Sequence, residues 1–152
     1  MRLDALTRPE LIFPGLEAAN ASTLLRTLAE RLVAAGVGTD SEEIYQKLLE
    51  REQLGSTGIG SGVAIPHCKL AGLDRVALAI GMLRGGGIDF SAVDQKPVRL
   101  FFLVVSPGAA PAEHLQCLAA ISKWVKVEDH VRRMLELQDP QAIFDLLTGE
   151  GR

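Results

Sequence analysis

A histidine, His67, stands at the end of a stretch that combines flexible and rigid backbone, Ser56–Lys69 (STGIGSGVAIPHCK). The stretch contains three glycines: Gly58, Gly60 and Gly62. Glycine lets a backbone approach a ligand closely, whereas Pro66 fixes its own φ and biases the residue before it toward an extended conformation. We therefore predict that Val63–Ile65 is a short buried strand that presents His67 at a sheet edge. An imidazole placed there can act near neutral pH as a base, a metal ligand or a nucleophile.

Two other side chains, Arg51 and His114, can contribute to the same chemistry. His114 is expected in the first turn of a helix that begins at Glu113, where the helix N-terminus attracts anions and disfavours an imidazolium. Arg51 is expected near the C-terminal end of a helix that ends at about Glu52, a few residues before the glycines. Each of the two, taken alone, is typical of an exposed helix-end residue. Together with His67 they would form a site for an oxyanion or a phosphoryl group.

The elements that must position these residues follow from periodicity and from capping signals. Leucines at helical spacing predict a helix from Asn20 or Ser22 to Gly36, and Asp40 with Glu43 resembles a capping box that opens a second one. Apolar runs predict buried strands, and three more helices are expected near the C-terminus. The strands are expected over residues 76–83 and 98–105, and the later helices over 113–125, 129–137 and 141–147. Residues 1–19, which contain the turn signal Pro14-Gly15, are interpreted as an extended arm or a short edge strand.

These elements predict an α/β fold: a small mixed β-sheet of four to five strands flanked by helices on both faces. The length of 152 residues suits one domain, which we expect to span residues 1–152. A net charge of −3 and the absence of a basic run longer than Arg132-Arg133 argue against nucleic-acid binding. The apolar runs are too short to cross a bilayer, and the N-terminus lacks the apolar core of a signal peptide. With two cysteines and no disulfide framework, we expect a reduced, cytoplasmic protein without membrane insertion.

Three alternative chemistries could also use these residues. A zinc site would use His67, Cys68, His114 and Cys117, but adjacent residues on a strand point to opposite faces. A cysteine–histidine hydrolase would need an activated Cys68 or Cys117, and neither has an obvious activating neighbour. The run GIGSG lacks the lysine of a nucleotide-binding loop and leads into a strand where a helix should start, so that interpretation is rejected. We therefore expect neither a metal nor a cofactor.

The run from Arg51 to His67, REQLGSTGIGSGVAIPH, resembles the signature of the IIA domains of the bacterial phosphoenolpyruvate-dependent phosphotransferase system (PTS), fructose/mannitol class. Within that class the chain is most similar to the nitrogen-regulatory IIA proteins. The resemblance extends to the N-terminal helix pair, to Asp94–Pro97 with the apolar strand that follows, and to the proline loop before His114. It therefore covers nearly the whole chain. One departure is Cys68, which stands where many members have glycine.

The resemblance implies a phosphoryl carrier in which His67 is phosphorylated by a histidine-phosphorylated, HPr-like carrier protein. It implies that His114 helps to hold the phosphoryl oxygens and that Arg51 is the active-site arginine. Supporting or phosphate-binding roles are expected for the stretch between them: Ser56, Thr57, Gly58, Gly60 and Gly62. Two functions of the phosphorylated protein stay open. The protein is expected mainly to be a phosphorylation-dependent nitrogen or metabolic regulator that binds target proteins, and alternatively a sugar-specific component that passes the phosphoryl group to a IIB transport domain.

Overall fold

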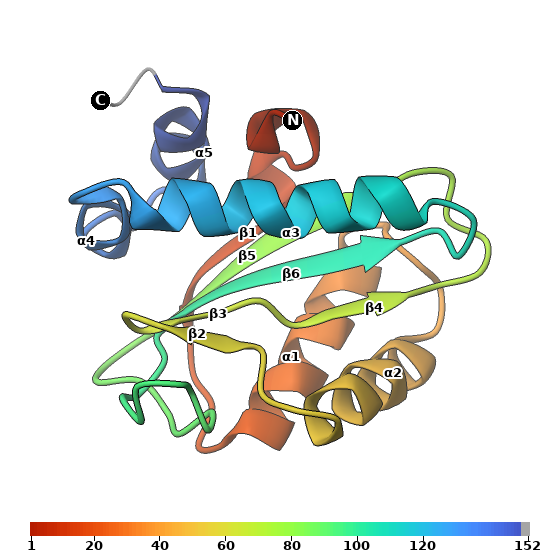
Figure 1. Cartoon of the computed structure of the whole chain (residues 1–152), viewed down its shortest axis with the longest axis horizontal. Coiled ribbons are helices and arrows are strands. Elements are labelled where there is room, and N and C mark those ends of the chain that lie inside the picture. The colour runs from red at the N-terminus through yellow and green to blue at the C-terminus, as the bar shows by residue number, and fades with distance from the viewer. Residues whose placement is uncertain (150–152) are drawn as a thin grey trace.

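The chain folds into three layers, with a mixed β-sheet between two groups of helices (Figure 1). The computed structural model describes residues 1–149, and the last three residues of the expected domain, 150–152, lie outside the described part. Within residues 1–149 the sheet has six strands, rather than the four to five expected, and five α-helices flank it on both faces. The predicted fold class is confirmed. No helix among these residues is long and apolar enough to cross a membrane.

The sheet is built around β6 (Leu100–Ser106), all of whose residues are buried. On one side β6 pairs antiparallel with β5 (Ala77–Leu83), and β5 pairs in parallel with the edge strand β1 (Ile12–Leu16). On the other side two short strands, β3 (Val63–Ala64) and β4 (His67–Lys69), both run parallel to β6. The outermost strand is β2 (Gly58–Gly60), which runs antiparallel to β3.

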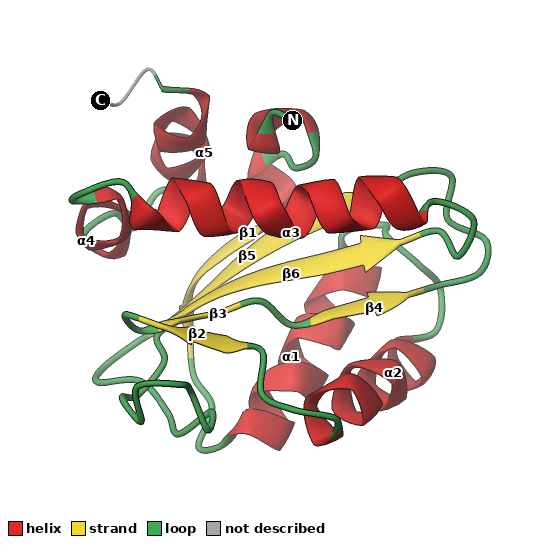
Figure 2. Ribbon diagram, in the orientation of Figure 1, coloured by secondary structure: helices red, strands yellow, loops and turns green. Residues whose placement is uncertain are grey.

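Helices α1 (Ala21–Ala34) and α2 (Ser41–Gln53) cover one face of the sheet (Figure 2). Both begin where the capping signals predicted: the Asn20 side chain accepts a hydrogen bond from Thr23 N, and the Asp40 side chain accepts one from Glu43 N. Their leucines pack on the strand residues that face them, and these include Cys68, Phe101 and Leu103.

Helices α3 (Pro111–Lys126), α4 (His130–Leu135) and α5 (Pro140–Thr148) cover the opposite face. Helix α3 begins at Pro111 rather than at the expected Glu113, because proline suits the first helical position, where no N–H partner is needed. Helix α4 is shorter than the expected range 129–137, and Asp129 precedes it with a φ of 71°. Helix α5 begins at Pro140, one residue before the expected range 141–147, and the Asp139 side chain caps it by accepting a hydrogen bond from Ala142 N.

The structure refines two other predictions near the sheet edges. Before β1, the N-terminal arm forms two short 3-10 turns, Leu3–Ala5 and Pro9–Leu11. Pro14-Gly15 lies inside β1, where the pairing register shifts, and does not end the strand. The strand predicted at residues 63–65 is shortened to Val63–Ala64, and His67 begins a separate strand, β4. Pro66, which has no N–H to donate to the ladder, lies between the two strands.

Candidate functional site

Arg51, His67 and His114 line one open depression of about 470 Å³, together with several leucine and lysine side chains. Three elements supply the three side chains: the last turn of α2, the first residue of β4 and the first turn of α3. In Figure 1, β4 lies between α2 and the first turns of α3. Residues far apart in sequence therefore meet because the short strand β4 pairs with β6 at this edge.

His67 is held in one orientation by two hydrogen bonds. Its Nδ1 lies 2.7 Å from the carbonyl oxygen of Ile65, and its Nε2 accepts a hydrogen bond from Nε of Arg51 at 3.2 Å. A carbonyl can only accept, so Nδ1 carries the ring proton and Nε2 keeps its lone pair. Arg51 is itself anchored, because its Nη1 donates to the carbonyl of Gly55 at 2.8 Å. The nucleophilic nitrogen available in this arrangement is Nε2.

His114 lies against His67, with ring centroids 5.2 Å apart and ring planes inclined by 59°. Its Nδ1 is 2.6 Å from the hydroxyl oxygen of Ser106, the last residue of β6. Ser106 is not among the site residues predicted from the sequence, although a polar residue that ends an otherwise apolar strand is a usable signal. The β4–β6 register, in which His67 lies opposite Val104, places His67 and Ser106 on the face covered by α3.

The two cysteines lie on opposite faces of the sheet, and Cys68, but not Cys117, borders the depression. Cys68 is buried in the core under α1 and α2, whereas Cys117 is buried in the core under α3. Burial raises the pKa of the Cys68 thiol to about 12 and that of Cys117 to about 11, which disfavours the thiolate needed for zinc binding or nucleophilic attack. The described residues also contain no group of three or more His, Cys, Asp or Glu arranged to hold a metal ion.

The hydroxyls of Ser56 and Thr57 are engaged in holding the chain behind the site. Thr57 donates to the carboxylate of Glu52 from both its backbone N–H, at 3.1 Å, and its hydroxyl. Ser56 donates to the carbonyl of Phe90 at 2.6 Å. These bonds join the end of α2 to the loop between β5 and β6, and neither hydroxyl lines the depression. Their contribution in this structure is to fix the path of the chain toward His67.

The glycines of the same stretch permit close packing and a tight turn. A Cβ on Gly58 would lie 2.8 Å from Cβ of Ala92, so the backbone there packs directly against the β5–β6 loop. Gly60 and Gly62 have φ values of 94° and 79°, a region that other residues rarely adopt, and they form the turn between β2 and β3. Cys68 is not among the residues with positive φ, so its position does not require a glycine.

Both histidines of the depression favour the neutral imidazole. Burial lowers the pKa of His67, the charge of Arg51 lowers it further, and the hydrogen bond to Ile65 opposes the shift. Burial also lowers the pKa of His114, with smaller contributions from His67 and Lys69. At neutral pH the site therefore offers two uncharged imidazoles beside one guanidinium.

We expect His67 and His114 to titrate below about pH 6.5, the ordinary histidine value. The physical reason is the loss of hydration on burial, which penalises the charged ring. Ring ¹H and ¹⁵N shifts measured from pH 4.5 to 8.5 would give both midpoints, with a histidine-containing peptide in the same buffer as the reference. A midpoint above that of the peptide for either ring would contradict the expectation.

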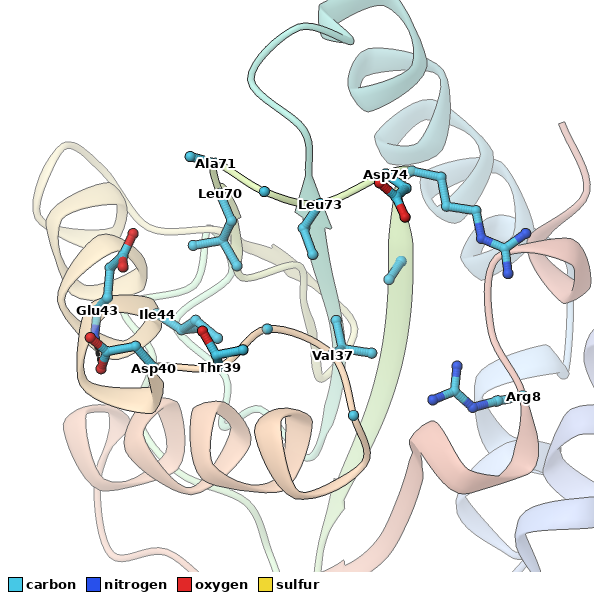
Figure 3. Close-up of a pocket in the computed structure, with 15 residues that line it drawn as sticks. Arg8, Val37, Thr39, Asp40, Glu43, Ile44, Leu70, Ala71, Leu73 and Asp74 are labelled. Atoms are coloured by element: carbon cyan, nitrogen blue, oxygen red, sulfur yellow. Dashed lines mark hydrogen bonds between the residues drawn. The ribbon is translucent and has the colours of Figure 1, made fainter.

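A second depression of about 560 Å³ lies at the other end of α2 and contains none of the three site residues (Figure 3). Apolar side chains, including Val37, Ile44 and Leu70, line this depression, and Arg8 also lines it. Arg8 is tied to the fold, since its Nη2 donates to the carbonyl of Ala35 at 2.7 Å. This depression shares no lining residue with the first, so substitutions on its rim can serve as controls for substitutions at the candidate site.

Comparison with known proteins assigns the chain to a family. Residues 5–149 match the family profile described as "Phosphoenolpyruvate-dependent sugar phosphotransferase system, EIIA 2". A nitrogen regulatory protein of Bradyrhizobium diazoefficiens is 36% identical over 148 residues, which cover 97% of this chain and 95% of the relative. A PTS system fructose-specific EIIA component of Haloferax volcanii is 34% identical over 146 residues, covering 96% and 94%. The crystal structure of the nitrogen regulatory protein IIA-Ntr from Neisseria meningitidis superposes with a TM-score of 0.86 at 26% identity, covering 95% of this chain and 97% of that one.

Proposed function

Because the chain belongs to the EIIA 2 family of the phosphoenolpyruvate-dependent sugar phosphotransferase system, we propose that residues 1–152 form one phosphoryl-carrier domain that is phosphorylated on Nε2 of His67. The donor is a histidine-phosphorylated, HPr-like carrier protein. The observation that carries this proposal is the geometry of His67, whose Nε2 accepts a hydrogen bond from Arg51 in an open depression that His114 also lines.

The transfer needs little from the protein beyond positioning and charge stabilisation. The Nε2 lone pair attacks phosphorus in line, a new N–P bond forms, and the N–P bond on the donor histidine breaks. The electron pair of that bond returns to the donor ring. The Nδ1 proton of His67 stays in its hydrogen bond to the Ile65 carbonyl, which stabilises the positive charge that the ring acquires.

Arg51 has two successive tasks in this proposal. Before transfer its Nε–H occupies the Nε2 lone pair and orients the ring, so this bond must open when the phosphoryl group arrives. The guanidinium then faces the phosphoryl oxygens, to which it can donate two hydrogen bonds at once. Its Nη1 anchor to Gly55 keeps the group at the site while this exchange takes place.

We propose that the phosphorylated and unphosphorylated forms act mainly in nitrogen or metabolic regulation, by binding different target proteins. The similarity to nitrogen regulatory proteins along nearly their full length supports this destination. A second candidate is transfer to a IIB transport domain, which the similarity to a fructose-specific EIIA component supports.

The test is incubation of the protein with the general phosphoryl carriers and phosphoenolpyruvate, followed by mass spectrometry of the labelled residue. Affinity capture of partners, with each phosphorylation state as bait, would then separate the two destinations. Transfer of label onward to a IIB domain would favour transport. Capture of a non-transport protein by one state only would favour regulation. Absence of label on His67 would refute the carrier function itself.

Two exposed leucines flank the candidate site and suggest where the donor protein docks. Leu54, directly after α2, is 85% exposed, and Leu115, next to His114, is 65% exposed, and both line the depression. Exposed apolar groups around a reactive centre are typical of protein contacts. Val93 is exposed to a similar degree, 83%, but lies in the β5–β6 loop outside the depression.

We expect Leu54→Asp to lower kcat/KM for phosphoryl transfer from the carrier by about tenfold, the usual scale for one lost interface anchor. Val93→Asp, the matched control, should leave this rate unchanged. Phosphoramidate, a small donor that needs no docking surface, should label both variants at the wild-type rate. Equal losses in the two variants, or a loss of labelling by phosphoramidate in Leu54→Asp, would contradict the proposed docking role.

A further inference from the structure

Ser106 is the one polar residue of β6, and its hydroxyl meets the ring of His114 inside the protein. Ser106 is fully buried, and its Oγ lies 2.6 Å from Nδ1 of His114. The strand fixes its position, because Ser106 lies opposite Lys69 in the β4–β6 ladder and its carbonyl accepts a hydrogen bond from Leu70 N at 2.8 Å. We propose that Ser106 is a positioning residue that donates its hydroxyl proton to Nδ1 and thereby holds His114 in the tautomer with the proton on Nε2. This inference deepens the proposed function and rests on it for its role in phosphoryl transfer.

The direction of the hydrogen bond follows from the surroundings of the hydroxyl. A serine hydroxyl has one proton to donate, and His114 Nδ1 is the only hydrogen-bond partner of this hydroxyl among the described residues. If Nδ1 donated instead, the hydroxyl proton would be left in a fully buried place without an acceptor, which is costly. Donation by Ser106 satisfies both groups. The neutral ring then carries its own proton on Nε2.

The two histidines of the site consequently hold opposite tautomers. His67 keeps its proton on Nδ1, bonded to the Ile65 carbonyl, and presents a lone pair at Nε2. His114 keeps its proton on Nε2, a nitrogen that forms no hydrogen bond within the described part of the chain. With the ring centroids 5.2 Å apart, one ring supplies the nucleophile and the other supplies a donor for the phosphoryl oxygens.

The alternative tautomer of His114 would work against transfer. Nε2 of His114 would then carry a lone pair, which would repel the negatively charged oxygens of the phosphoryl group on His67. A bond that excludes this tautomer before the phosphoryl group arrives removes a reorganisation step from the reaction. Ser106 thus acts through His114, without touching the phosphoryl group itself.

The tautomer can be measured directly in unphosphorylated protein. In a long-range ¹H–¹⁵N spectrum at pH 8, we expect His114 to show an unprotonated Nδ1 and a protonated Nε2, with the signals assigned by their loss in His114→Gln. Ser106→Ala should shift both nitrogens toward averaged values, and Ser106→Thr, which keeps the hydroxyl, should restore the wild-type pattern. A protonated Nδ1 in the wild type, or an unchanged pattern in Ser106→Ala, would overturn the proposal.

Kinetics give a second readout that simple packing would not reproduce. We expect Ser106→Ala to slow phosphoryl acceptance by about tenfold, less than the loss expected for a direct transition-state donor, and Ser106→Thr to stay close to wild type. In a His114→Ala background, Ser106→Ala should add almost nothing, because its action passes through the missing ring. A full tenfold loss in that background would overturn the proposal. If the wild-type protein took no label at all, the carrier function would fail, while the spectra would still decide the tautomer.

Discussion

His67→Gln is expected to take up no phosphoryl label from a phosphorylated carrier, whereas the wild-type protein is labelled at one histidine. Glutamine can fill much of the same space, but its amide nitrogen has no lone pair available for attack on phosphorus. The effect should therefore be complete. His114→Gln is the matched comparison, since it removes the neighbouring ring and leaves the nucleophile, and it should still accept label at a reduced rate.

The chemistry of the label distinguishes His67 from the hydroxyls nearby. A phosphohistidine is a phosphoramidate, which is lost in acid and survives mild base, the reverse of a phosphoserine ester. Ser56 and Thr57 lie close in sequence, yet both hydroxyls donate to protein acceptors, the Phe90 carbonyl and the Glu52 carboxylate. Label that persists in acid, or that appears equally in His67→Gln, would refute the phosphohistidine mechanism.

The long helices and strands can be predicted from the sequence because the residues that indicate them are close together in the chain. The side chains of Asn20 and Asp40 cap helices within three residues of their own position, so the beginnings of α1 and α2 can be predicted from short windows. Strand β6 is a continuous apolar run, and burial on both faces produces such a run directly. Helix α3 begins two residues before the predicted Glu113, because proline is a favourable first helical residue as well as a loop residue.

The short strands were harder to predict because their formation depends on a distant partner. Strands β2 and β4 have three residues each, and β4 exists only through its pairing with β6, more than thirty positions later. No window around His67 contains that information. The same pairing decides which side chains reach the α3 face, so the contact between Ser106 and His114 could not be derived from spacing alone. The strand alternation rule did predict that His67 and Cys68 point to opposite faces.

The convergence of Arg51, His67 and His114 was an expectation from the ends of elements, and the structure brings these three side chains into one depression. The sequence could not show that Arg51 donates to Nε2 rather than to Nδ1, because this depends on the Ile65 carbonyl having already taken the other nitrogen. The tautomer of His67, and with it the identity of the nucleophilic atom, therefore comes from the backbone path around Pro66.

Arg51→Gln is expected to slow phosphoryl acceptance by about a hundredfold, since it removes the guanidinium that, alone among residues 1–149, lines the depression and faces the developing charge. Arg51→Lys should recover part of the loss, because an ammonium restores the charge but not the paired donors. Arg75→Gln, a change at an exposed arginine of the second depression, is the matched control and should behave as wild type.

The Arg51→Gln substitution should also change the pH dependence of the rate, which is a second, independent measurement. Arg51 contributes to the low pKa of His67, so Arg51→Gln should raise that pKa and move the acidic limb of the rate profile to higher pH. A slower rate with an unmoved acidic limb would mean that the guanidinium does not act on His67 in solution, and that its bond to Nε2 is not maintained.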